Sequence, residues 1–199
     1  HSRTLMPMVE SLLVNCGLTL EEIDVIAVAA GPGSFTGLRI GVAAAKGLAW
    51  SGDKPCAGVS TLEALAWGAA HMDGEICAVM DARRKQVYNA RFEAVNGRPV
   101  RLTPDRAIGI ETLRAELREG GKGQILVGDG ALLCYNELNE SGLPVRLSPP
   151  HLRFQTAWGV ARAALELAGA GKLITAGALA PVYHRLSQAE RERLSGISE

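Results

Sequence analysis

The sequence predicts an α/β fold, because apolar runs of strand length alternate along the chain with longer segments of helical periodicity. Two of the apolar runs, at 24–30 and 124–128, lead into a Gly-x-Gly turn that precedes a helical segment. Such turns are common in α/β proteins, and the echo suggests two related halves. Of the 199 residues, 47% are hydrophobic and 21% charged, which is enough to build a hydrophobic core.

The charge balance and the cysteines narrow the class of protein. Lys+Arg and Asp+Glu both number 21, so the net charge is zero, which argues against binding nucleic acid by overall charge alone. No apolar stretch is long enough to span a bilayer. The scattered cysteines form no C-x-x-C pair, which favours reduced, buried thiols in a cytoplasmic protein. These cysteines are Cys16, Cys56, Cys77 and Cys134.

The segment up to residue 73 is predicted to form a first lobe. Its first helix is amphipathic, and Pro7 indicates that this helix begins nearby or is kinked there. The last helix has Ser60 or Thr61 as its N-cap and Glu63 in position for a capping box. The elements expected are helix 2–15, strand 24–30, helix 36–50, strand 55–59 and helix 61–71.

A break at residues 72–74 is predicted to begin a second lobe, which covers 74–199. Alternating apolar residues on either side of the turn Asp81–Lys85 predict an antiparallel hairpin. The charged turn is interpreted as solvated, with contact to a partner or RNA as the alternative. The elements expected are strands 76–81, 86–95, 100–102, 124–128 and 144–147, helices 110–119, 131–139 and 156–168, an edge segment at 181–183 and a charged tail from Ser187.

The Gly-rich segment 31–41 joins a strand to a helix, which is a common place for a ligand in α/β proteins. Its spacing fits neither G-x-x-x-x-G-K-[ST] nor G-x-G-x-x-G, and no acidic residue follows where a ribose would need one. These mismatches make nucleotide binding the alternative interpretation and not the favoured one. The favoured interpretation is a tight turn that lets the following helix pack closely.

The helix over 36–50 carries small residues on most of its surface. Glycine inside a helix costs about 1 kcal/mol relative to alanine, so Gly41 and Gly47 indicate close approach by another backbone. The residues expected to face the sheet are Leu38, Val42, Ala45 and Ala49. Those expected to face another chain are Ile40, Ala44, Gly47 and Trp50, with Arg39 and Lys46 at the rim.

Signatures of catalysis are sparse in the sequence. The histidines show no metal-binding spacing, and no G-x-S-x-G is present. Gly128-Asp129-Gly130 could receive a phosphate or ribose, although a plain turn is favoured. We therefore predict no catalytic, cofactor-binding or metal-binding residue.

The segment Gly31-Pro32-Gly33-Ser34-Phe35-Thr36-Gly37-Leu38-Arg39-Ile40-Gly41 closely resembles the signature of the bacterial TsaB (YeaZ) family. The resemblance implies the actin-like ATPase (ASKHA) fold of two RNase-H-like lobes. Family members begin with a D-T-[AS] strand and a hairpin, so we expect the first lobe to be incomplete at its N-terminus, with an open sheet edge. Further matches are His1 with Leu5 and Pro7, Gly58–Leu62, Asp81–Arg83 with Val87-Tyr88, and Pro181–Tyr183.

The resemblance also implies a function, the making of N6-threonylcarbamoyladenosine at position 37 of tRNAs that read ANN codons. It implies a non-catalytic subunit that pairs with the catalytic paralogue TsaD and the ATPase TsaE, forms a homodimer without TsaD and meets tRNA only through the complex. The metal-binding H-x-x-x-H of TsaD-like relatives falls here at Thr61 and Leu65, which cannot replace imidazoles. The alternative is a stand-alone ATP-binding enzyme of the same fold, formerly labelled a glycoprotease.

In this family the first two helices of the first lobe form a bundle with the same helices of TsaD or of a second copy. An assembly subunit should expose a small, apolar helix face at 36–50, whereas an enzyme should gather carboxylates or histidines in a cleft. The residues expected at the interface are Leu5, Met8, Leu12, Gly33, Phe35, Arg39, Ile40, Ala44 and Gly47.

Overall fold

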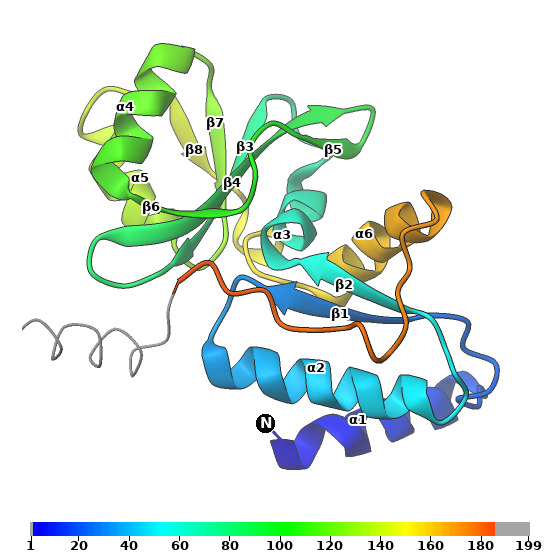
Figure 1. Cartoon of the computed structure of the whole chain (residues 1–199). Coiled ribbons are helices and arrows are strands. Elements are labelled where there is room, and N and C mark those ends of the chain that lie inside the picture. The colour runs from blue at the N-terminus through cyan, green and yellow to red at the C-terminus, as the bar shows by residue number, and fades with distance from the viewer. Residues whose placement is uncertain (1, 186–199) are drawn as a thin grey trace, which may run out of the picture.

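The computed structural model describes residues 2–185, which form an α/β structure with two separate sheets, as predicted (Figure 1). The helices are α1 (Ser2–Cys16), α2 (Phe35–Trp50), α3 (Thr61–Ala69), α4 (Ile110–Gly120), α5 (Ala131–Asn139) and α6 (Ala157–Gly169), with a short 3₁₀ helix at Pro150–Leu152. The strands are β1 (Ile26–Gly31), β2 (Cys56–Ser60), β3 (Glu75–Asp81), β4 (Gln86–Val95), β5 (Arg98–Arg101), β6 (Arg106–Gly109), β7 (Gln124–Val127) and β8 (Val145–Leu147).

The first sheet is a parallel pair, β1 and β2, covered on both faces. Alternate strand residues point to opposite faces, so Val28 packs with α2 while Ala27 packs with α3 and α6. The residues of α2 that were predicted to face the sheet are its buried ones: Leu38, Val42, Ala45 and Ala49. Among the described residues, β1 has β2 as its only strand partner.

The second sheet has the order β5-β4-β3-β7-β8, with β6 also paired to β4. The predicted β3–β4 hairpin is confirmed as antiparallel, and β7 and β8 continue the sheet in parallel. One face packs against α3 through residues such as Phe92, and the other is covered by α4 and α5 around Leu113 and Leu138. Strand β6 was not predicted.

Helix α3 lies between the two sheets, and seven of its nine residues are buried. Helix α6 returns from the second sheet to pack on α3 and on the first sheet. At Gly159 a Cβ atom would lie 2.2 Å from the carbonyl oxygen of Ala64, so only glycine permits this approach. The boundary at residue 73 stays a prediction, and α6 packs on elements that precede it.

The predicted N-cap of α3 is confirmed, whereas the predicted end of this helix differs from the structure. Ser60 is the N-cap of α3, since its hydroxyl accepts the Glu63 N–H at 3.1 Å. Helix α1 begins at Ser2 and runs through Pro7, and α3 ends at Ala69 rather than near residue 71. The predicted tail from Ser187 lies outside the described residues.

Three of the cysteines, Cys56, Cys77 and Cys134, are buried as predicted, and all four are free thiols. The prediction is wrong for Cys16, the last residue of α1, which is exposed because no other part of residues 2–185 covers this side of the helix. Within the described part of the chain, no helix combines the length and apolarity that a membrane span requires.

Candidate partner-binding face and interlobe cavity

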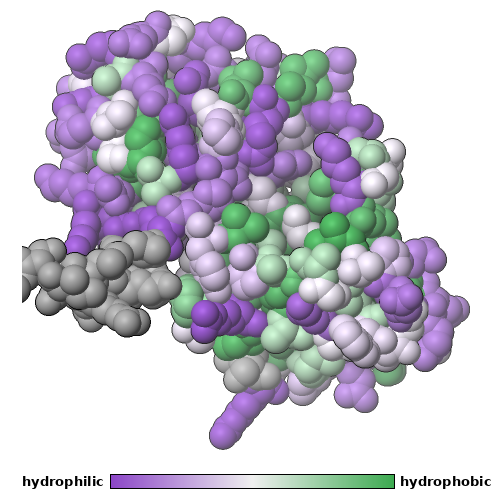
Figure 2. Space-filling view, viewed as in Figure 1, coloured by the Kyte–Doolittle hydropathy of each residue, from purple (hydrophilic) through white to green (hydrophobic). Residues whose placement is uncertain are grey.

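Helix α1 has an apolar face that the rest of residues 2–185 leaves uncovered. In the described part of this helix, residues 3–16, no side chain is buried. Met8 and Leu12, four residues apart on one side of the helix, have exposed fractions of 66% and 64%. On soluble proteins, a large contiguous apolar patch commonly marks an interaction site, whereas single exposed apolar residues are ordinary. On the side of the molecule shown in Figure 2, apolar surface is more extensive over the first lobe than over the second.

A hollow of about 390 Å³ lies between α1 and α2, which run side by side with α1 on the outer side (Figure 1). It brings together Leu5, Met8 and Ile40, three of the residues expected at the interface. Leu12 borders an adjoining hollow along α1. The remaining lining of the first hollow is Thr4, Ser34, Thr36, Gly37 and Gly41.

Gly41 and Gly47 of α2 have no steric role in the packing of residues 2–185. A Cβ atom at Gly47 would meet nothing within 4 Å, and one at Gly41 would lie at an ordinary 3.6 Å from Cγ2 of Val28. Packing against the rest of residues 2–185 therefore explains neither glycine. Each costs about 1 kcal/mol of helix stability relative to alanine, and the described residues give no steric reason for either.

Two other expected interface residues, Phe35 and Arg39, contact the C-terminal segment of the same chain. The ring of Phe35 stacks on Tyr183 with centroids 4.8 Å apart, and the Arg39 guanidinium lies 3.9 Å from the Phe35 centroid. Arg39 Nε also donates to the Tyr183 hydroxyl at 3.1 Å. On the same face Lys46 Nζ donates to the carbonyls of residues 177 and 179. Residues 177–183 therefore cover this side of α2. The sequence did not predict this contact.

A second cavity, of about 430 Å³, lies between the two lobes. Gly33 and Phe35 line it from the β1–α2 turn, Asp129 lines it from the β7–α5 turn, and residues 182–185 close one side. Both Gly-x-Gly turns noted in the sequence therefore face one cavity. The rest of its lining is Pro32, Ser34, Met80, Asp81, Ala82, Arg83 and Tyr88.

The glycines of the turn itself serve packing. At Gly31 (φ +147°) a Cβ atom would lie 2.2 Å from the Val182 carbonyl oxygen. At Gly37 it would lie 2.7 Å from Oγ of Ser34, the hydroxyl that caps α2 by accepting the Gly37 N–H at 3.1 Å. These contacts agree with the favoured interpretation of a tight turn.

The interlobe cavity carries charges of both signs. Asp81 accepts the Arg83 N–H at 2.7 Å, and Asp129 accepts the Asp81 N–H at 3.2 Å. Across residues 2–185 there is no cluster of three or more His, Cys, Asp or Glu side chains that could hold a metal ion. The positions that would correspond to a metal pair, Thr61 and Leu65, are buried in α3 with exposed fractions of 6% and 1%.

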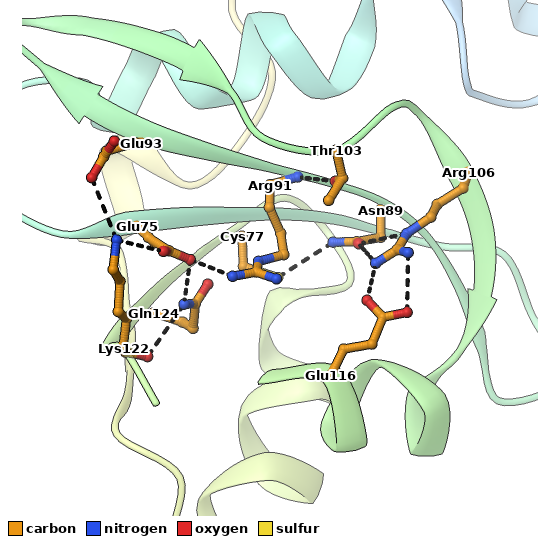
Figure 3. Close-up of polar contacts among 10 residues, drawn as sticks. All are labelled: Glu75, Cys77, Asn89, Arg91, Glu93, Thr103, Arg106, Glu116, Lys122 and Gln124. Carbon is orange, nitrogen blue, oxygen red and sulfur yellow. Dashed lines mark hydrogen bonds and ion pairs between the residues drawn. The ribbon is translucent and has the colours of Figure 1, made fainter. Parts of the chain in front are cut away.

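Away from both cavities, the second sheet contains a network of charged and polar side chains (Figure 3). Arg91 contacts Glu75 at 2.5 Å, and both side chains are largely buried. Gln124 donates to the same carboxylate at 2.9 Å, and Lys122 lies 3.2 Å from its other oxygen. Burial alone would raise the pKa of Glu75, but these hydrogen bonds and the Arg91 charge hold it below its ordinary value.

The network continues to Asn89, which donates to Cys77 Sγ at 3.3 Å and accepts from Arg106 (Figure 3). Arg106 is held in turn by a bidentate pair with Glu116 on α4. Burial raises the pKa of the Cys77 thiol to about 12, so this sulfur stays protonated. Each arginine of the network is thus paired with a carboxylate, Arg91 with Glu75 and Arg106 with Glu116.

Comparison with known proteins decides the family. The family model for TsaD, described as tRNA N6-adenosine threonylcarbamoyltransferase, matches residues 1–129. The tRNA threonylcarbamoyladenosine biosynthesis protein TsaB of Escherichia coli K12 is 31% identical over 188 residues, which cover 93% of this chain and 80% of the relative. The chain belongs to the TsaB family.

Other members of the TsaB family extend the match. The Bacillus subtilis TsaB is 42% identical over 128 residues, covering 64% of this chain and 56% of the relative, so the match spans little more than half of that protein. A solved Pseudomonas aeruginosa protein described as similar to peptidase YeaZ has a TM-score of 0.77 at 28% identity, covering 93% of this chain and 84% of its own. The expected family and its actin-like ATPase fold are thereby confirmed.

Proposed function

We propose that this chain is a non-catalytic assembly subunit in the biosynthesis of N6-threonylcarbamoyladenosine at position 37 of tRNAs that read ANN codons. It pairs with TsaD, the ATPase TsaE joins the complex, and tRNA is modified by the assembly in the cytoplasm. Membership of the TsaB family supports the pathway, since curated relatives carry the description of a tRNA threonylcarbamoyladenosine biosynthesis protein.

The observation that carries the proposal is the uncovered face of α1 and α2. Helix α1 buries none of its side chains at 3–16, yet it presents Met8 at the hollow beside Ile40 and Leu12 at the adjoining hollow. A stable interface needs an apolar centre into which a partner can pack, and this face supplies one. The open space beside Gly47 lets a partner helix come close. In the absence of TsaD, a second copy of the chain occupies the same face.

The positions of Thr61 and Leu65 support a subunit without its own chemistry. Both are buried in α3, and their side chains offer no imidazole to a metal. The carboxylates that line the interlobe cavity, Asp81 and Asp129, accept hydrogen bonds from backbone N–H groups of the chain. TsaD therefore supplies the reacting groups in the proposed complex.

A matched pair of glycine variants tests the interface. Gly47→Leu adds a side chain at a point where the chain has open space, so we expect a fold at least as stable as the wild type, since leucine favours helix by up to about 1 kcal/mol. We also expect loss of co-purification with the cognate TsaD and loss of tRNA threonylcarbamoylation by the reconstituted mixture. The control is Gly169→Leu, a change at another open helical glycine on α6.

The control should assemble and support modification as the wild type does. Full assembly by Gly47→Leu, together with undiminished modification, would place the interface elsewhere. Modification by TsaD and TsaE without this chain, or by this chain alone, would contradict the assembly role itself.

The interlobe cavity favours a second candidate, a stand-alone ATP-binding enzyme of the same fold. Its volume of about 430 Å³ is that of a small-molecule site, and α2 begins at its edge. Calorimetric titration of the isolated chain with Mg-ATP distinguishes the two. Binding with ATP turnover by the chain alone supports the enzyme, and no turnover supports the assembly subunit.

A further inference from the structure

The turn between β3 and β4 presents three consecutive cationic residues, Arg83, Arg84 and Lys85. All three are exposed, and the side chain of Arg83 is 88% accessible. Their φ angles are +66°, +54° and +56°, so each adopts the left-handed conformation that residues with a Cβ rarely take. Glycine or asparagine would suit these positions better. The backbone alone therefore does not explain why the turn is built from arginine and lysine.

Hydrogen bonds hold this cationic turn in one shape. The Gln86 N–H donates to the Arg83 carbonyl at 3.1 Å, and the Ala82 N–H donates to the Gln86 carbonyl at 3.0 Å. The carbonyl of Lys85 accepts from the N–H of Ile110 at the start of α4. The side chains of residues 83–85 thus project from a fixed base, which lowers the entropy lost when they bind a ligand.

The charge of the turn is only partly neutralised. Arg83 lies 3.5 Å from the half-buried Asp81, and because the arginine itself is exposed the contact contributes little. Arg84 and Lys85 have no ion-pair partner among residues 2–185, and Arg185 adds a further cation by donating to the Ala82 carbonyl. Asp81 and Asp129 are the acidic residues of the adjoining cavity, so cations are in excess here although the whole chain has zero net charge.

We propose that the cationic turn, residues 83–85 with Arg185, binds phosphate groups of the RNA backbone. The proposal rests on the proposed function, because it assigns the turn to the tRNA held by the complex. Guanidinium and ammonium groups on a fixed turn suit phosphate oxygens, which accept several charge-assisted hydrogen bonds.

An acidic protein partner fits this surface less well than RNA does. Interfaces between proteins need an apolar centre, and the turn with strands β3 and β4 up to residue 94 exposes no large hydrophobic side chain. The exposed Val182 and Tyr183 line the adjoining cavity instead. Phosphate contacts need no such centre and depend on local charge. The zero net charge of the chain agrees with RNA contact through one turn and not through the whole surface.

The experiment is a titration of the TsaD complex of this chain with a fluorescent, unmodified transcript of an ANN-reading tRNA, followed by anisotropy at several salt concentrations. We expect the double variant Arg84→Ala/Lys85→Ala to bind about tenfold more weakly at low salt. The slope of log K against log salt should fall by about 1.5, since two phosphate contacts are removed. The matched control is Arg118→Ala/Lys172→Ala, which removes two exposed cations without ion-pair partners in residues 2–185 and should change binding less than twofold.

Equal affinity and equal salt slope for the wild type and the Arg84/Lys85 variant would overturn the proposal. So would loss of TsaD from that variant with unchanged tRNA binding by what remains, because the turn would then contact protein. If the wild-type chain fails to assemble with TsaD, the proposed function is overturned instead. The same titration on the chain alone then decides the RNA contact, with the same tenfold loss expected of the variant.

Discussion

At the scale of single residues, Glu75 shows how a carboxylate is accommodated at the edge of a hydrophobic core. Its side chain is 6% accessible, yet Arg91, Gln124 and Lys122 all contact its oxygens. These contacts keep the pKa of Glu75 below its ordinary value in the folded chain, against the effect of burial. The unfolded chain therefore binds a proton at a pH where the folded chain does not.

This difference makes Glu75 a source of acid sensitivity. Its contribution is fully present above the ordinary carboxyl pKa of about 4.3 and is lost as the pH falls through the lower pKa of the folded state. We expect Glu75→Gln to lower the free energy of unfolding at pH 7 by about 1–3 kcal/mol, because Arg91 is left without its counter-charge. Urea denaturation between pH 7 and pH 3 should show this deficit shrinking as the pH falls.

The control for this experiment is Glu140→Gln, at an exposed glutamate that makes no ion pair within residues 2–185. It should follow the wild-type stability curve at every pH. A deficit in Glu75→Gln that stays constant down to pH 3 would mean that the carboxylate charge is not what the network stabilises.

At the scale of elements, the contact between α3 and α6 depends on one missing side chain. Gly159→Ala would place a Cβ atom 2.2 Å from the backbone oxygen of Ala64, and backbone cannot move aside as a flexible side chain can. We expect a loss of about 1–3 kcal/mol in the free energy of unfolding, measured by urea denaturation. Gly169→Ala, at an open site on the same helix, should leave stability unchanged or raise it by up to about 1 kcal/mol. Equal stability of the two variants would show that α6 does not pack this closely.

Elements with strong local signals could be predicted from the sequence. The 3.6-residue period of α2 identified its buried face, and Ser60 was recognisable as a cap. Strand β6 was missed because its four residues, Arg106–Gly109, carry too little apolar pattern. It is a strand because the ten-residue β4 extends beyond β5 and offers its first residues as a second edge.

Contacts between distant segments account for what the sequence did not reveal about the site. The apolar face of α1 was recognisable from helical spacing, whereas the family resemblance placed Leu5, Met8 and Ile40 on one surface. The stacking of Tyr183 on Phe35 was not recognisable, because it joins residues far apart in the chain through a segment without regular structure. The interface as a whole was expected from family resemblance, since no periodicity identifies a partner.

At the scale of the whole molecule, the features divide by surface. The first lobe carries the apolar face of α1 and α2, the cavity with its mixed charges lies between the lobes, and the cationic turn projects from the second sheet. The chain, whose net charge is zero, therefore carries its exposed apolar face and its cationic turn on different surfaces. This arrangement suits a subunit that holds a protein partner at one surface and reaches RNA at another.

The most direct test of the central claim is the affinity of the chain for its cognate TsaD, measured by calorimetry on the wild type and on Met8→Glu/Leu12→Glu. Both residues are exposed, so the variant should keep its free energy of unfolding within about 0.5 kcal/mol. A charge at the centre of the face should weaken binding by about 100-fold or more, roughly 3 kcal/mol. Leu165→Glu, at an exposed leucine on α6, should bind as the wild type does. Wild-type affinity in the α1 double variant would contradict the assignment of this face to the partner.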